Sequence, residues 1–96
     1  MRKLHHQVKA REDLKNIWLY SFSEHGEQQA DKYFDELTAG MAAIESNPEI
    51  GMSCDYIRLG YRQYQINQHF VFYRLDSKKI NIIRILHQKM DMARYF

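Results

Sequence analysis

Ile-Asn-Ile-Ile-Arg-Ile-Leu-His-Gln-Lys-Met-Asp, residues 80–91, is the stretch that decides the fold of this chain. Its first seven residues alternate and are apolar on both faces, which is typical of a strand in the middle of a sheet. Strict alternation predicts two apolar sets on opposite faces: Ile80, Ile82 and Leu86 on one, Ile83 and Ile85 on the other. This central strand should therefore carry the polar residues that follow it to one end of the sheet.

The polar run begins inside the strand with one long cation, Arg84, and continues past its end with His87, Lys89, Met90 and Asp91. Histidine is a common acid or base near neutral pH, and the cations can pair with phosphate or carboxylate. The run can therefore catalyse a reaction, bind a partner, or only end the strand.

Two further strands precede this one. The apolar and aromatic stretches 61–66 and 69–75 are separated by Asn67-Gln68, and residues 76–79 turn into the strand at 80–86. Two tight turns in succession predict an antiparallel meander of three strands.

The chain before the meander reads as a strand and two helices. Alternation over residues 4–8 predicts a short strand, and apolar residues at helical spacing predict a helix from Lys9 to about His25, with Glu12 and Asp13 in its first turn. Gly26 ends this helix, and a second helix runs from Glu27 to Asn47-Pro48. The short connection requires an antiparallel helix hairpin.

The order of these elements predicts a single α+β domain over residues 1–96. The helix hairpin should cover one face of an antiparallel sheet, and the other face should be open to a partner. Residues 48–60 form a loop near the upper end of ordinary loop lengths.

Composition narrows the class of protein. The 45% of hydrophobic and 27% of charged residues are ordinary for a globular protein, and no apolar run is long enough to span a bilayer. The N-terminus lacks the apolar core of a signal peptide, and the single cysteine, Cys54, fits the reducing cytoplasm. Residues 1–48 hold 6 Lys/Arg and 8 Asp/Glu, whereas residues 49–96 hold 8 and 4, so the basic half suggests an anionic partner.

The order and spacing of several motifs resemble the ParE branch of the ParE/RelE superfamily of bacterial type II toxins. The segments are Lys9-Ala10-Arg11-Glu12-Asp13-Leu14, Gly26-Glu27-Gln28-Gln29-Ala30 with Tyr33, Asn47-Pro48-Glu49-Ile50-Gly51, Gly60-Tyr61-Arg62, Phe72-Tyr73, and Ile82 through His87 followed by Met90-Asp91. The resemblance covers essentially the whole chain.

The resemblance implies a cytoplasmic toxin that is neutralised by a ParD-like antitoxin. ParE-type members inhibit DNA gyrase and stabilise cleaved DNA, so binding rather than catalysis would be the activity. RelE- and YoeB-type relatives use the same fold as ribosome-dependent mRNA endonucleases, and fold alone does not decide between the two. A third alternative is a member without a target that only binds its antitoxin. DNA would be contacted only through the antitoxin complex.

A ribonuclease of this fold needs a base, an acid and cations for the charged phosphorane. Arg62 and Arg84 could clamp the phosphate, and His87 could act as acid or base with Glu49 or Tyr95 as its partner. The pattern departs from the YoeB type because Gln88, rather than tyrosine, follows His87, and the loop before the meander lacks the lysines of RelE-type enzymes.

Structural roles compete with these functional ones. Arg62 and Arg84 could pair with acids or cap carbonyls, and His87 could be a hydrogen-bonding strand end. The histidines have no metal-ligand spacing, so no metal and no cofactor are expected. Helical spacing places four aromatic residues in the core: Trp18, Phe22, Tyr33 and Phe34.

The sequence therefore favours the gyrase-directed toxin without catalytic residues. The predicted target-binding residues are Arg84, His87, Lys89, Met90 and Asp91. The predicted antitoxin contacts are Arg58, Arg62, Tyr73 and Arg84, together with apolar anchors on the helix hairpin.

Overall fold

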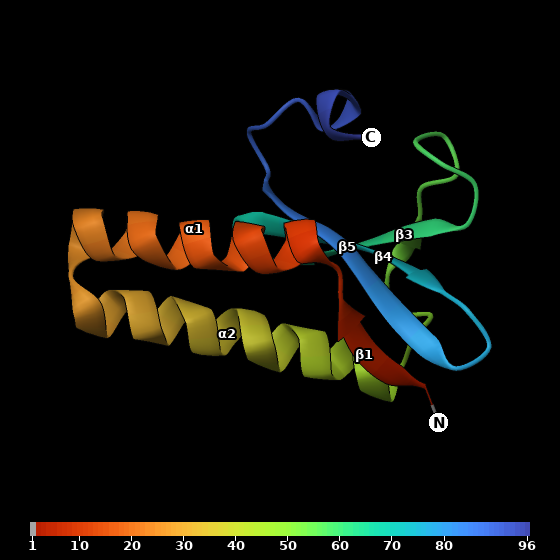
Figure 1. Ribbon diagram of the computed structural model, residues 1–96, viewed down its shortest axis with the longest axis horizontal. Coiled ribbons are helices and arrows are strands. Elements are labelled where there is room, and N and C mark those ends of the chain that lie inside the picture. The colour runs from red at the N-terminus through yellow and green to blue at the C-terminus, as the bar shows by residue number, and fades with distance from the viewer. Residues whose placement is uncertain (1) are drawn as a thin grey trace.

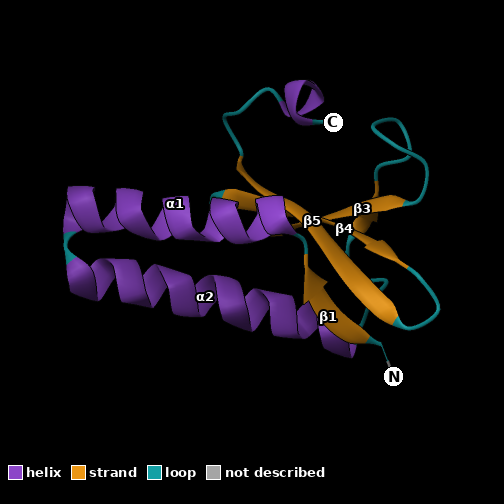
Figure 2. Ribbon diagram, in the orientation of Figure 1, coloured by secondary structure: helices purple, strands orange, loops and turns teal. Residues whose placement is uncertain are grey.

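The computed structural model describes residues 2–96 and has the predicted α+β architecture (Figure 1). Figure 2 shows the helix hairpin on one side of the molecule and the strands gathered on the other. The elements are β1 (Lys3–His6), α1 (Val8–His25), α2 (Glu27–Ser46), β2 (Met52–Ser53), β3 (Tyr61–Ile66), β4 (His69–Leu75), β5 (Lys79–His87) and a final 3-10 turn, η1 (Met92–Tyr95).

The sheet has the strand order β1-β5-β4-β3-β2. The meander β3-β4-β5 is antiparallel, as predicted, but β1 pairs with β5 in parallel. The sheet is therefore mixed, which corrects the expectation of an antiparallel one. The predicted loop at 48–60 also contains the two-residue edge strand β2, which adds to β3.

A β-bulge in β5 overturns the predicted facing of its apolar residues. Phe72 is opposite Arg84, whereas the next residue of β4, Tyr73, is opposite Ile82, so Ile83 is an extra residue. A bulge shifts the alternation by one. Ile80, Ile82 and Ile85 consequently share the helix-side core. Leu86 lies in a second cluster on the outer face, opposite to the prediction.

The helix hairpin is held to the sheet by one end only. In Figure 1 the far half of α1 and α2 extends well beyond the strands, so the hairpin covers less of the sheet than predicted. Of the residues of α1, only Ala10 is fully buried, whereas α2 buries Ala30, Leu37, Met41 and Ile44.

Because much of the hairpin overhangs the sheet, the predicted aromatic core is wrong in part. Phe22 is 47% and Phe34 is 39% exposed, and Trp18 is only half-buried. The first turn of α1 holds no acid, because the helix begins at Val8, one residue before the predicted start, and Glu12 and Asp13 lie in its second turn.

Gly40 allows α2 to approach the sheet closely. A Cβ at this position would overlap the side chain of Ile66 on β3. The cost of an interior glycine, about 1 kcal/mol relative to alanine, is therefore offset by packing that no larger residue permits.

The outer face of the sheet, which we expected to be open, carries its own small core. Cys54, Phe72 and Leu86 are buried there. The C-terminal tail folds back onto this face, where the ring of Phe96 meets the ring of Phe72 edge-on at a centroid distance of 4.9 Å. The tail is thus an ordered part of the domain.

Candidate functional site

Arg84, the first residue of the polar run 84–91, forms an ion pair that joins β5 to α1. The Arg84 Nε and Nη2 donate to the two carboxylate oxygens of Asp13, each at 2.8 Å. This is the single salt bridge among residues 2–96, and both side chains are largely buried, with 15% and 12% exposed. The hydrogen bonds to Asp13 raise the pKa of the Arg84 guanidinium above its ordinary value.

Asp13 also replaces a missing strand. β1 ends at His6, opposite Ile82, so β5 continues without a neighbour on that side. The Ile85 backbone N–H, which points to this gap, donates to Asp13 Oδ2 at 2.9 Å. The sequence did not predict this role of Asp13, because the N–H that it accepts belongs to Ile85, 72 positions away.

The second side of the Arg84 guanidinium faces the tail. Its Cζ lies 5.1 Å from the centroid of the Tyr95 ring, within the range of a cation–π contact. The ribonuclease alternative uses Tyr95 as a partner of His87. The tail does fold back, but the contact that it makes is with Arg84.

His87 ends β5 beside a second histidine. The two rings of His69 and His87 meet edge-on with centroids 5.1 Å apart. His87 Nδ1 accepts a hydrogen bond from the backbone N–H of Lys89 at 3.1 Å. His87 is therefore a strand-end hydrogen bonder, as one of the alternatives predicted, and its Nε2 atom remains for other contacts.

His69 is buried at the start of β4, with 9% exposed. Burial, followed by the nearby His87, lowers its pKa to about 4, so the ring is neutral at pH 7. Its Nδ1 lies 2.6 Å from the Tyr33 hydroxyl on α2. Burial raises the pKa of Tyr33, and its oxygen accepts the Gln68 N–H at 3.4 Å. Sequence reasoning had not linked these residues.

These groups line a cleft of about 1050 Å³ between the overhanging hairpin and the end of the sheet. Four of the five predicted target-binding residues lie on it: Arg84, His87, Lys89 and Met90. The fifth, Asp91, is exposed and precedes the final turn η1. Residues of α1 that sequence reasoning did not single out form the facing wall, including Asn16, Tyr20 and His25.

Arg62 and Tyr73 hold the loop after α2. The Arg62 Nη1 donates to the carbonyl oxygen of Gly51 at 2.8 Å, as the carbonyl-capping alternative predicted. The Tyr73 hydroxyl donates to the Pro48 carbonyl at 2.8 Å and accepts from the Gly51 N–H at 2.9 Å. Tyr73 is fully buried, so the structure gives it this role in place of the predicted antitoxin contact.

The three residues of the ribonuclease alternative are not brought together. Arg62 is in register with Tyr73 and lies on the helix face of the sheet, whereas Arg84 is in register with Phe72 on the outer face. Side chains of adjacent residues in register share a face, so the two arginines leave the sheet in opposite directions. A joint phosphate clamp would need them on one side.

Arg58 lies in an exposed loop among large apolar side chains. It is itself exposed, and Met52, Tyr56 and Leu59 are 72%, 78% and 86% exposed. Such a cluster of apolar residues with an arginine has the composition of an interface. Cys54, in the same loop, is buried, and burial raises the pKa of its thiol.

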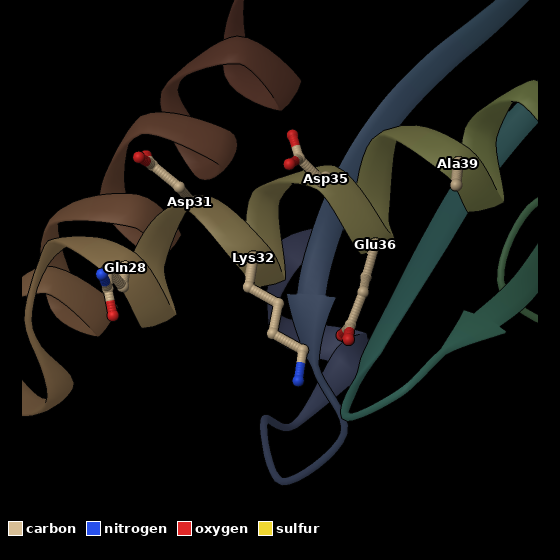
Figure 3. A pocket seen from close by; sticks show the side chains of 6 residues that line it. All are labelled: Gln28, Asp31, Lys32, Asp35, Glu36 and Ala39. Carbon is tan, nitrogen blue, oxygen red and sulfur yellow. The ribbon is translucent and has the colours of Figure 1, made fainter.

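A shallow depression on α2 has a different character (Figure 3). It is lined by Gln28, Asp31, Lys32, Asp35, Glu36 and Ala39. All six come from one helix, and Figure 3 shows their side chains pointing apart. It is the polar surface of a helix and does not gather groups for chemistry.

Two negative findings apply to residues 2–96. No three His, Cys, Asp or Glu side chains are grouped so that they could hold a metal ion. Neither helix is long and apolar enough to cross a membrane.

Solved structures of known proteins share the fold. "Chromosomal ParDE TA system from P. aeruginosa" contains a chain with a TM-score of 0.81 at 21% identity, over 91% of this chain and 96% of that one. "YoeB/ParE toxin from Agrobacterium tumefaciens" gives a TM-score of 0.61 at 15% identity, over 88% and 96%. These likenesses define the fold class, a small α+β domain with the RelE-like fold.

The sequence comparisons are more specific. Residues 6–92 match the family described as the ParE toxin of type II toxin-antitoxin system, parDE. Toxin ParE1 of Mycobacterium tuberculosis (strain CDC 1551 / Oshkosh) is 38% identical over 86 residues, which are 88% of each chain. Toxin ParE1 of Caulobacter vibrioides is 40% identical over 83 residues, which are 86% of this chain and 85% of that one. This chain belongs to the ParE toxin family, as the resemblance implied.

Proposed function

We propose that this chain is a toxin that inhibits DNA gyrase by binding, stabilises cleaved DNA, and is neutralised by a ParD-like antitoxin. The observation that supports it most directly is the gathering of Arg84, His87, Lys89 and Met90 along one cleft. With Asp91 beside them, these residues form a continuous contact surface at the end of β5, on a rigid support.

The rigidity of this support comes from the ion pair at its base. Asp13 fixes both the guanidinium of Arg84 and the backbone of Ile85. A surface that is ordered before binding loses little conformational entropy on binding. The end of β5 is therefore suited to a binding toxin, which acts through contact alone.

The ribonuclease alternative has less support in the geometry. Arg62 and Arg84 lie on opposite faces of the sheet, and each is engaged with groups of the chain itself. Arg84 lies on the same cleft as His87, but Arg62 does not, so the two cations are not assembled around one phosphate in the way that phosphoryl chemistry needs.

The antitoxin is proposed to contact the opposite, exposed face of the hairpin as well as the arginines. Trp18 and Phe22 stack with centroids 5.2 Å apart, and Trp18 Nε1 donates to Asp31 of α2, so the two helices present one aromatic surface. Leu19 and Phe34, on the same two helices, are also exposed, at 47% and 39%. These are the proposed apolar anchors, and acids of the antitoxin would lie near Arg58, Arg62 and Arg84.

Purified components distinguish the two activities. With gyrase, plasmid DNA and ATP, the chain should inhibit supercoiling and yield linear, protein-linked DNA. With ribosomes and mRNA, it should produce no codon-dependent cuts. Cuts that disappear in His87→Ala would replace the gyrase proposal with the ribonuclease one.

The antitoxin contacts are tested by charge reversal. Arg58→Glu combined with Arg62→Glu should weaken antitoxin binding by at least about 100-fold, because each contact that turns repulsive costs about 1.4 kcal/mol or more, a factor of about ten. Lys32→Glu, on the exposed polar side of α2, is the matched control. Unchanged affinity in the double variant would remove the arginines from the interface.

A further inference from the structure

Most carboxylate oxygens that line the cleft under the hairpin already accept hydrogen bonds from other residues of the chain. Both oxygens of Asp13 are engaged by Arg84 and the Ile85 N–H. Glu36 Oε2 accepts from the Asn67 side-chain amide at 2.6 Å. The acids on the wall of the cleft are therefore occupied by partners within the chain.

The two histidines, in contrast, present donors. Because His87 Nδ1 accepts the Lys89 N–H, the neutral ring carries its proton on Nε2. The Tyr33 oxygen accepts the Gln68 N–H, so its own proton is directed to His69 Nδ1, and the neutral His69 ring also carries its proton on Nε2. Within residues 2–96, neither Nε2 has a hydrogen-bond partner.

A free cation and two apolar side chains complete the cleft. The Lys89 ammonium forms no ion pair with any residue of the described chain. Tyr20 of α1 is 63% exposed, and Met90, after β5, is 43% exposed. Both line the same cleft, and such exposed aromatic and methionine side chains are enriched where proteins bind one another.

We propose that this cleft is the seat of an acidic segment of the target protein. A carboxylate of that segment accepts hydrogen bonds from His87 Nε2–H and from the Lys89 ammonium. A neighbouring apolar side chain of the segment packs between Tyr20 and Met90. The target segment therefore binds between α1 and the end of β5, and does not contact residues 84–91 alone.

The inference rests on the proposed function, because it places the same target in the cleft. It adds the facing wall and the chemistry of the bound segment. Apart from Arg84, the antitoxin contacts are assigned outside the cleft, to Arg58, Arg62 and the other face of the hairpin, where Phe22 and Phe34 are exposed and Trp18 is half-buried. Variants of the cleft should therefore affect the target and leave the antitoxin bound.

The test measures the toxin concentration that halves gyrase supercoiling. His87→Leu, Lys89→Glu and Tyr20→Ala should each raise it at least about tenfold, because a charge-assisted hydrogen bond or a buried aromatic contact contributes more than 1.4 kcal/mol. His87→Gln retains an N–H donor and should restore most of the inhibition that His87→Leu loses. Lys15→Glu, exposed on α1 away from the cleft, should inhibit as the unaltered chain does.

Antitoxin affinity and thermal melting are measured on every variant. Loss of gyrase inhibition with both unchanged supports the proposal. If the cleft variants inhibit gyrase as the unaltered chain does, the proposal is overturned. If they weaken antitoxin binding and leave gyrase inhibition intact, the occupant is the antitoxin and the proposal is also overturned.

A different result separates this inference from the proposed function. If the unaltered chain does not inhibit gyrase, the proposed function fails, and growth arrest on induced expression becomes the readout. Lys89→Glu and Tyr20→Ala should then abolish arrest while His87→Gln retains it. Arrest that survives Lys89→Glu, or that His87→Gln abolishes as a catalytic histidine would require, overturns the cleft. An unaltered chain without arrest overturns both proposals.

Discussion

Arg84 and Arg62 belong to the same sheet, two strands apart, yet different chemistry holds them. Arg84 is paired with a carboxylate from α1 and is stacked on Tyr95. Arg62 is held by backbone carbonyls of the loop that Tyr73 also fixes. The first arrangement places a charge pair in a largely buried setting, whereas the second joins a cation to neutral backbone carbonyls. The first should therefore be the more costly to break.

The largest effect is expected from Asp13→Ala. This change leaves the Arg84 cation and the Ile85 N–H without their acceptors, and a broken, largely buried pair costs about 3 kcal/mol. Urea unfolding measures the loss. Glu12→Ala, one residue away and exposed, is the control and should lie within about 0.5 kcal/mol of the unaltered chain. A loss of less than 1 kcal/mol in Asp13→Ala would mean that water replaces the carboxylate without cost.

The next effect is a pH dependence at His69, which lines the same cleft as Arg84. The pKa of His69 is about 4 in the folded chain and near 6.5 when unfolded, so between these values the unfolded chain binds more protons. The free energy of unfolding should therefore fall by about 2 kcal/mol as pH is lowered from 7 to 4. This loss is smaller than the pKa difference alone would give, because the ring partly faces the open cleft. Urea unfolding along this pH range should show a weaker dependence in His69→Gln. Equal slopes would contradict the assignment.

Tyr73→Phe tests the loop on the Arg62 side. It removes a buried hydroxyl that serves the Pro48 carbonyl and the Gly51 N–H, so a loss of about 1.5 kcal/mol is expected. Tyr64→Phe, a half-buried tyrosine of the neighbouring strand, is the matched control. Calorimetric melting of the two variants compares them directly, and equal melting temperatures would show that the Tyr73 hydroxyl contributes nothing.

The smallest effect is expected from Arg62→Met, about 1 kcal/mol, because the change removes a hydrogen bond to a neutral carbonyl and leaves no charge unpaired. The same change at Arg84, Arg84→Met, should cost more, since it leaves Asp13 as an unpaired, largely buried anion. Urea unfolding of both variants ranks them. Arg62→Met as the more damaging change would reverse the comparison between the two arginines.

Local signals explain what the sequence predicted well. Asn67 adopts a positive φ of 54° in the turn between β3 and β4, and Gly26 one of 86° between the helices, so residue types suited to those conformations marked the boundaries. The run Arg84–Met90 was predicted as a site because it lies at the end of an apolar strand. Residues at the end of such a strand lie close together at one end of the sheet.

The missed features depend on residues distant in sequence. Asp13 becomes a substitute strand neighbour only because β1 stops at His6. The wall containing Tyr20 exists because the hairpin overhangs the sheet, and the tail seats Phe96 on Phe72 only once β4 is formed. The alternation of apolar residues could not reveal the bulge at Ile83. Its neighbours are the apolar Ile82 and the long side chain of Arg84, and either residue type is compatible with either face of the sheet.

That bulge makes the length of β5 as informative as its composition. If Ile83 were instead paired regularly with Phe72, Arg84 would have the parity of Ile82 and Ile85 would turn to the outer face. The extra residue, Ile83, thus shifts the alternation of side chains along the strand by one position. It lets one continuous apolar segment serve the helix-side core first and then present a cation and a histidine to the cleft.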